Sequence, residues 1–262
     1  MKLEKIVNWL DQTLNVAAFD DVSNNGIQVA WADNRPVATV AFAVDASVKA
    51  VKAAAKAGAQ LLVVHHGISW GGGIRRIKGG VYNVVKAAMD ANLAIYACHL
   101  PLDAHPVLGN NAQLAKLLGL KHVKPAFNYH GNVIGLVGES SNRRIVELSN
   151  RTEETFESRI LKALAMACTR RFDDSDDSTI LTIGLCSGGA GEFAEEAKRL
   201  GCGLYVTGEA SWGEVIAAEN CGMEMICAGH YETEVFGIRA VAKAMAKALK
   251  VKTVDLSQNG RI

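Results

Sequence analysis

The fold is decided by residues 37–67, which read VATVAFAVDASVKAVKAAAKAGAQLLVVHHG. The apolar run from Val37 to Val44 predicts a strand, and the alanine-rich run from Ala46 to Ala57 predicts a helix. The run from Gln60 to Val64 predicts a second strand. A strand, a helix and a strand in this order make the crossover unit of a parallel sheet, so the stretch predicts an α/β protein.

The same alternation extends in both directions from this stretch. Leu3, Ile6, Val7 and Leu10 recur at the spacing of one helix face, and a strand is expected from Ile27 to Trp31. Beyond residue 67 the pattern predicts helices over 80–91, 110–118, 153–168, 192–200, 212–220 and 235–249, and strands over 93–98, 132–137, 179–185, 203–206, 224–227 and 251–256. The segment 121–131 is interpreted as a boundary between two α/β domains, 1–125 and 126–262, with mostly parallel sheets and outer helices.

Composition excludes several classes of function. The chain has 262 residues, of which 49% are hydrophobic, which is enough to form a globular core. Its net charge of +1 gives no reason to expect nucleic acid or an anionic membrane as a partner. We find no signal peptide and no apolar run near the ~20 residues that span a bilayer. The six cysteines form no CxxC pair and are interpreted as small buried residues of a reducing compartment, which predicts a cytoplasmic protein.

Polar side chains gather at the expected carboxyl ends of strands, where α/β sheets bind ligands. His65 and His66 follow a wholly apolar strand directly, and where the strand ends both rings can face one crevice. An isolated pair of this kind is also compatible with one structural and one solvated histidine. Asp103 follows another strand and a proline turn, where a capping role is the ordinary alternative.

Two more strand ends carry possible ligands. Glu209 ends the run Val206-Thr207-Gly208-Glu209. The ordinary alternative is that this run leads into a helix and that the side chain of Thr207 or Glu209 contacts backbone amides at the start of the helix. His230 and Glu234 lie four residues apart, which places both on one face of a helix that begins at His230. That spacing is common and by itself is weak evidence for a site.

Taken together, three histidines and two carboxylates at the same edge of the predicted sheets indicate a metal centre. They are His65, His66, His230, Asp103 and Glu234. Five donors exceed the need of one open catalytic ion and suit two divalent ions, zinc, iron or manganese, about 3.5–4 Å apart. Glu234 is our candidate for the bridging carboxylate. Two such ions with two carboxylates keep a positive charge, which favours an anionic, phosphate-bearing small-molecule substrate.

The chain resembles the NIF-three-like family of dinuclear-metal hexameric proteins, the GTP cyclohydrolase 1 type 2 homologues. The resemblance spans essentially the whole chain and rests most specifically on the double histidine and on residues 229–237, which read GHYETEVFG. Weaker support comes from residues 25–29, which read NGIQV, and from the runs 99–103, 109–111 and 206–209.

The resemblance implies a ligand set, an assembly and an activity. The family's metal ligands fall on His65, His66, Asp103, His230 and Glu234. The family's architecture implies two similar α/β domains with the metal site between them, and a ring-shaped hexamer, or toroid, whose metal sites face an internal cavity. His99 matches a position beside the metals, where it is expected either to transfer protons or to be a buried structural residue. The glycine-rich loop after the double histidine carries Arg75, Arg76 and Lys78, which either bind substrate phosphate or are simply solvated.

The leading hypothesis is a metal-dependent hydrolase acting on a nucleotide or purine, for example in the ring opening of GTP, with either His99 or the solvent between the ions as the catalytic proton carrier. The metal site is argued from residues, whereas GTP as substrate follows only from the family's name. Two alternatives stay open: a non-catalytic metal-binding scaffold that recruits protein partners, and a di-iron redox protein.

Overall fold

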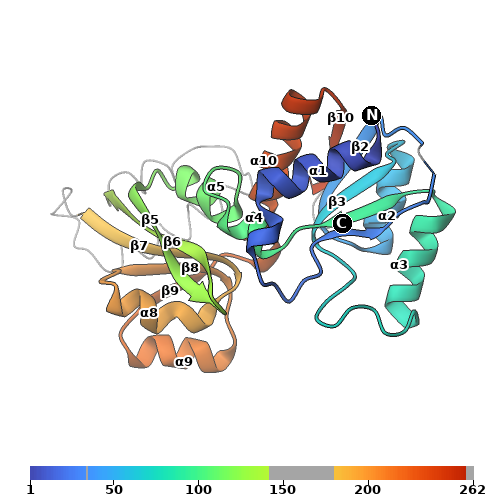
Figure 1. The fold of residues 1–262 in the computed structure, drawn as a ribbon. Helices are drawn as coiled ribbons and strands as arrows, with labels where there is room; N and C mark the ends of the chain where they lie inside the picture. The colour runs from blue at the N-terminus through green and yellow to red at the C-terminus, as the bar shows by residue number, and fades with distance from the viewer. Residues whose placement is uncertain (34, 142–179, 258–262) are drawn as a thin grey trace. The chain divides into compact units, whose positions relative to one another are not determined.

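The computed structural model describes residues 1–33, 35–141 and 180–257 of the chain (Figure 1). They form a mixed α/β structure with two five-stranded sheets flanked by helices. Contacts divide the chain into two compact units, residues 1–109 with 235–262 and residues 110–234. The expected helix over 153–168, which includes Cys168, lies outside the described residues.

Unit 1 contains a largely parallel sheet. Its strand order is β1 (Gly26–Val29), β4 (Ala94–Ala97), β3 (Leu61–His66), β2 (Thr39–Asp45) and β10 (Lys252–Asp255). Only β1 runs antiparallel to its neighbour, while β4, β3, β2 and β10 are parallel. The helices of this unit are α1 (Leu3–Leu14), α2 (Val48–Lys56), α3 (Gly79–Asp90), α4 (Leu100–Ala104) and the part of α10 (His230–Leu249) from Val235 onward.

The two faces of this sheet are covered by different helices, as alternation along a strand requires. Leu61 and Val63 of β3 face a core that includes the buried residues of α1 and α10. Leu62 and Val64 face a second core with the buried residues of α2 and α3. The wholly apolar sequence of β3 before its two histidines is thereby explained, because both of its faces are buried.

Unit 2 contains a sheet of mixed direction. Its strand order is β5 (Lys121–Tyr129), β6 (Asn132–Ser141), β7 (Ile180–Gly189), β8 (Leu204–Glu209) and β9 (Glu224–Cys227). The first three strands pair antiparallel, and β7, β8 and β9 pair parallel. Its described helices are α5 (Asn110–Leu117), α8 (Ala194–Arg199) and α9 (Trp212–Asn220).

The structure differs from the sequence predictions in three respects. Residues 121–129, interpreted as a boundary, form strand β5, whose first five residues are exposed and therefore lack the apolar alternation of a half-buried strand. The sequence placed one boundary after residue 125, whereas the chain passes between the units near residues 109 and 234, because β10 pairs with β2. Cys227, predicted to be buried, is exposed at the end of the edge strand β9.

Cys98, Cys186 and Cys202 are buried as predicted, whereas Cys221, also predicted to be buried, is only half-buried. Within residues 1–33, 35–141 and 180–257, none of the helices combines the length and hydropathy needed to cross a membrane.

Helix α10 supplies part of the core of unit 1, which leads to a test of stability. Met245 is fully buried there, so Met245→Ala is expected to lower the free energy of unfolding by about 2–5 kcal/mol through lost burial and the cavity that remains. Lys247→Ala, an exposed change two residues further along, is the control. Urea unfolding followed by circular dichroism measures both, and equal midpoints would contradict this packing of α10.

Candidate metal centre

The double histidine ends β3, and each ring is fixed by an oxygen at its Nδ1 atom. His65 is fully buried, and its Nδ1 lies 2.9 Å from the carbonyl oxygen of Cys98. Because a carbonyl oxygen only accepts, Nδ1 of His65 carries a proton, and in the neutral ring Nε2 is then the atom with the lone pair. His66 places its Nδ1 2.8 Å from Oδ1 of Asp45, the residue beside it in the parallel register of β2 and β3.

The third ring, His99, follows β4 and is held in the same manner. Its Nδ1 lies 2.9 Å from Oδ1 of Asp21, while its backbone N–H donates to Oδ1 of Asn25 over 2.8 Å. The side chain of Asp21 is only 2% exposed. Burial raises the pKa of Asp21, but the hydrogen bond and charge of His99, with the donors of Ser23 and Asn25, outweigh burial and hold that pKa below its usual value.

Asp103 reaches the same place from α4, a short helix of five residues after β4. Pro101 lies in the first turn, where its missing N–H costs no helical hydrogen bond. The backbone N–H groups of Leu102 and Asp103 both donate to the carbonyl oxygen of His99 and close the turn. As a result, Oδ2 of the buried Asp103 lies 3.4 Å from Nε2 of His65.

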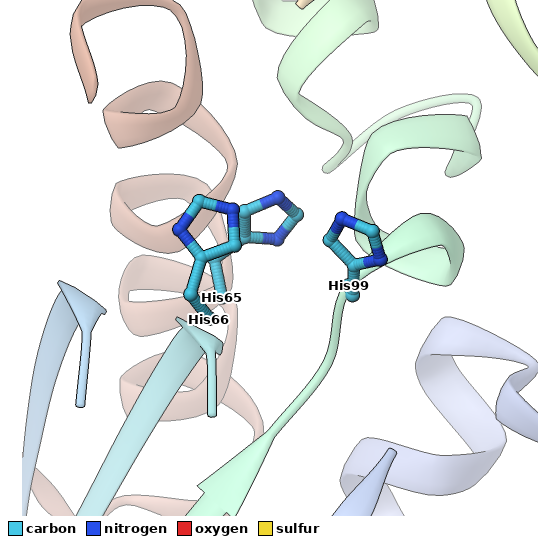
Figure 2. A group of neighbouring side chains, drawn as sticks. All are labelled: His65, His66 and His99. Atoms are coloured by element: carbon cyan, nitrogen blue, oxygen red, sulfur yellow. The ribbon is translucent and has the colours of Figure 1, made fainter. Parts of the chain in front are cut away.

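Unit 1 therefore brings His65, His66, His99 and Asp103 together. Figure 2 shows the three imidazoles gathered beyond the ends of the strands. The ring centroid of His65 lies 4.6 Å from that of His66 and 5.1 Å from that of His99, and one ligand atom of each ring lies within 4.8 Å of those of the other two.

This donor set fits a divalent metal ion. Histidines that bind metals usually donate their second ring N–H to a carboxylate or a backbone carbonyl, which fixes the tautomer and aims the other nitrogen. All three Nδ1 atoms have such an oxygen partner. The Nε2 atoms of His65 and His66 are therefore the atoms that could bind an ion, and Nε2 of His99 could either bind an ion or exchange a proton. Imidazole nitrogen and carboxylate oxygen together are accepted by zinc, iron and manganese.

The segment that leads into β1 fixes both turns that carry these residues. The amide of Gln28 accepts from the N–H groups of Ile68 and Ser69 over 2.6 and 3.2 Å, directly after the double histidine. Asp21 also accepts from the N–H of Leu100 over 2.9 Å. One short piece of chain thus holds the ends of β3 and β4 in place.

Unit 2 brings His230 and Glu234 together at the first turn of α10. Nε2 of His230 lies 3.1 Å from Oε1 of Glu234, and Nδ1 lies 2.9 Å from Oε1 of Glu209. Glu234 is 3% exposed. Gly188 allows this burial, because a Cβ atom there would collide with the Glu234 carboxylate.

Sequence reasoning did not assign Asp21, Asp45 or Gln28 a role in the site. Asp45 could have been found, because it ends the strand beside β3 and the rule of strand ends applies to it equally. Asp21 and Gln28 act through hydrogen bonds to residues far away in the sequence, and no local pattern predicts such pairs.

The fold and this cluster define a class: a mixed α/β protein with two sheets and a histidine-carboxylate group at strand ends. Residues 1–260 match the Duf34/NIF3 (NGG1p interacting factor 3) family. The chain is 38% identical to the GTP cyclohydrolase 1 type 2 homolog of Pyrococcus horikoshii over 97% of both proteins. It is also 38% identical to the protein of that name from Deinococcus radiodurans, over 91% of this chain and 86% of that one.

Solved structures agree with this assignment. The chain resembles protein ybgI, of unknown function, with a TM-score of 0.78 and 29% identity over 98% of both chains. It resembles the protein TTHA1606 from Thermus thermophilus with a TM-score of 0.74 and 28% identity over 98% of both. The chain therefore belongs to the Duf34/NIF3 family.

Close packing behind the double histidine generates a prediction at Gly67. A Cβ atom on Gly67 would collide with the amide of Gln28 and with Cβ of Ala97, so Gly67→Ala is expected to destabilise the protein by about 1–3 kcal/mol. Gly80→Ala is the matched control, because a Cβ atom there meets nothing and alanine favours helix α3. Thermal unfolding compares the two, and an unchanged melting temperature for Gly67→Ala would contradict this packing.

A second prediction concerns Asp21. Removing its carboxylate leaves the donors of His99, Leu100, Ser23 and Asn25 without their acceptor, so Asp21→Ala is expected to cost about 2–4 kcal/mol. Asp90→Ala, which removes an exposed ion pair with Lys86, is expected to change little and serves as the control. Urea unfolding measures both, and similar midpoints would refute the anchoring role of Asp21.

Proposed function

We propose that the protein is a metal-dependent hydrolase that acts on a purine nucleotide, with two divalent ions as cofactor. The observation that supports the proposal most is the group of three imidazoles in unit 1, each oriented at Nδ1 by an oxygen. A hydrogen bond at Nδ1 fixes the tautomer and the direction of the ring, which is how proteins orient histidines that bind a metal through Nε2.

We assign His65, His66 and Asp103 as ligands from unit 1. We assign His230 and Glu234 as the remaining ligands, because they combine a histidine with a buried carboxylate at one helix turn. Ions held by such a set would supply Lewis-acid polarisation and would make water a better nucleophile at neutral pH.

His99 is assigned the proton transfer. Because the Nδ1–H group of His99 donates a hydrogen bond to Oδ1 of Asp21, Nε2 of the neutral ring carries the lone pair and can accept a proton from the attacking water. As the bond in the substrate breaks, Nε2 returns that proton to the leaving atom, so the protein ends unchanged. Asp21 stabilises the doubly protonated ring in between, as the carboxylate does in a Ser-His-Asp triad.

The substrate class follows from charge and from the relatives. The ligand carboxylates Asp103 and Glu234 would offset only half of the charge of two divalent ions, so the ions could still bind an anionic group of a substrate directly. The carboxylates of Asp21, Asp45 and Glu209, which contact the histidines, lower the net charge of the surroundings. The name of the relatives, GTP cyclohydrolase 1 type 2 homolog, makes GTP the first candidate. The hexameric ring and the cytoplasmic location stay predictions of the sequence and its family resemblance.

The test compares metal content and turnover in three proteins. Wild type, purified without chelators, is expected to contain about two divalent ions per chain and to hydrolyse GTP or another nucleotide of a panel. His66→Ala is expected to lose at least about tenfold in metal affinity and in turnover. His122→Ala, which removes an exposed histidine of β5, is expected to match wild type in both.

Other outcomes would favour other functions. A wild-type protein that contains the ions but hydrolyses no nucleotide would refute the hydrolase and favour a scaffold. A coloured, iron-loaded protein whose activity zinc cannot restore would favour di-iron redox chemistry.

A further inference from the structure

Trp70 stands beside the histidine cluster and is not needed to hold a metal ion. Its ring centroid lies 5.2 Å from that of His99, in an edge-on arrangement, and 6.0 Å from that of His66. The side chain nevertheless stays 40% exposed. A large aromatic ring that is packed on one part and open on another can offer a surface for stacking.

Trp70 is fixed although it precedes a run of three glycines. Its indole N–H donates to the carbonyl oxygen of Gly67 over 3.0 Å. Its backbone pairs with Ser23 in an antiparallel bridge, and the next N–H, of Gly71, donates to Val22 over 2.6 Å. The ring is therefore held in position before a ligand arrives, which reduces the entropy lost on binding.

Positive charge follows Trp70 closely in the chain. Arg75, Arg76 and Lys78 are all exposed, and the sequence from residue 67 to residue 89 contains no aspartate or glutamate. Arginine and lysine bind phosphate by charge-assisted hydrogen bonds. The same loop thus offers an aromatic ring and several cations, which are the groups that a nucleotide requires at its base and at its phosphates.

We propose that Trp70 is the base-stacking residue of the site and that the cations of residues 75–78 bind the phosphates of the same purine nucleotide. This inference rests on the proposed function, which it deepens by naming what selects the substrate. Trp70 would distinguish a planar heterocycle from other anions, since any phosphate ester can use the cations but only a base can use the ring.

The experiment measures binding of GTP and of ribose 5-phosphate to the metal-loaded protein by calorimetry. Trp70→Ala is expected to weaken GTP binding by at least about tenfold, a typical loss when an aromatic ring that stacks on a base is removed. Trp70→Phe, which keeps a smaller ring, is expected to fall between Trp70→Ala and wild type. Trp212→Ala, which removes a tryptophan that is 76% exposed in unit 2, is expected to bind GTP as wild type does.

Ribose 5-phosphate separates stacking from charge. Its affinity is expected to be the same in wild type and Trp70→Ala, and to fall when Arg75 and Arg76 are replaced by alanine. Equal GTP binding by wild type and Trp70→Ala would overturn the proposal. A parallel loss of both ligands in Trp70→Ala and Trp70→Phe would also overturn it, because it would mean that the ring only supports the loop.

Metal content, measured in the same samples, separates this inference from the proposed function. A wild-type protein that holds its ions and binds no purine nucleotide overturns the stacking role and leaves the metal centre standing. A wild-type protein that binds GTP through Trp70 but holds no metal overturns the proposed hydrolase and supports the stacking role.

Discussion

The candidate site in unit 1 depends above all on the parallel register of β2, β3 and β4. That register places Asp45 beside His66 and Val64 beside Ala97, so three strands end at one edge of the sheet. Parallel pairing brings residues together that are far apart in the sequence, and each crossover needs a helix to return the chain. The buried alanines of α2 allow that helix to pack closely on the sheet.

Around this edge the side chains are held in fixed orientations. The three Nδ1 atoms face one backbone carbonyl and two carboxylates, so each ring has a single preferred tautomer. The backbone carbonyl of Cys98 fixes His65, and burial raises the pKa of the Cys98 thiol well above its usual value, to which the charges of Asp103 and Asp21 add. The possible ligands that the structure describes at this edge are the imidazoles of His65, His66 and His99 and the carboxylate of Asp103.

The sequence predicted the parts of the structure that local patterns encode. Strand β3 and its double histidine were recognisable because an apolar run, buried on both faces, ends abruptly in two polar rings. Strand β5 was not, because its exposed residues give no periodic signal. The membership of β10 in the sheet of unit 1 was not predictable either, since an apolar run does not specify which strand it pairs with. The same distinction holds in the site. His65, His66 and Asp103 were found at strand ends, whereas Gln28 acts through hydrogen bonds to Ile68 and Ser69 and by filling the space beside Gly67, which no local pattern encodes.

The loop after β3 has a fixed part and an exposed part, and the two can contribute differently to ligand selectivity. Up to Gly71 the loop is held to the segment before β1 by two backbone hydrogen bonds: the N–H of Asn24 donates to the carbonyl of Ser69, and the N–H of Gly71 donates to the carbonyl of Val22. The cations beyond it are exposed side chains, which attract any anion and are screened by salt. Discrimination between ligands of equal charge must therefore come from groups with fixed geometry. In this loop the indole of Trp70 is such a group, held at its N–H and along its backbone.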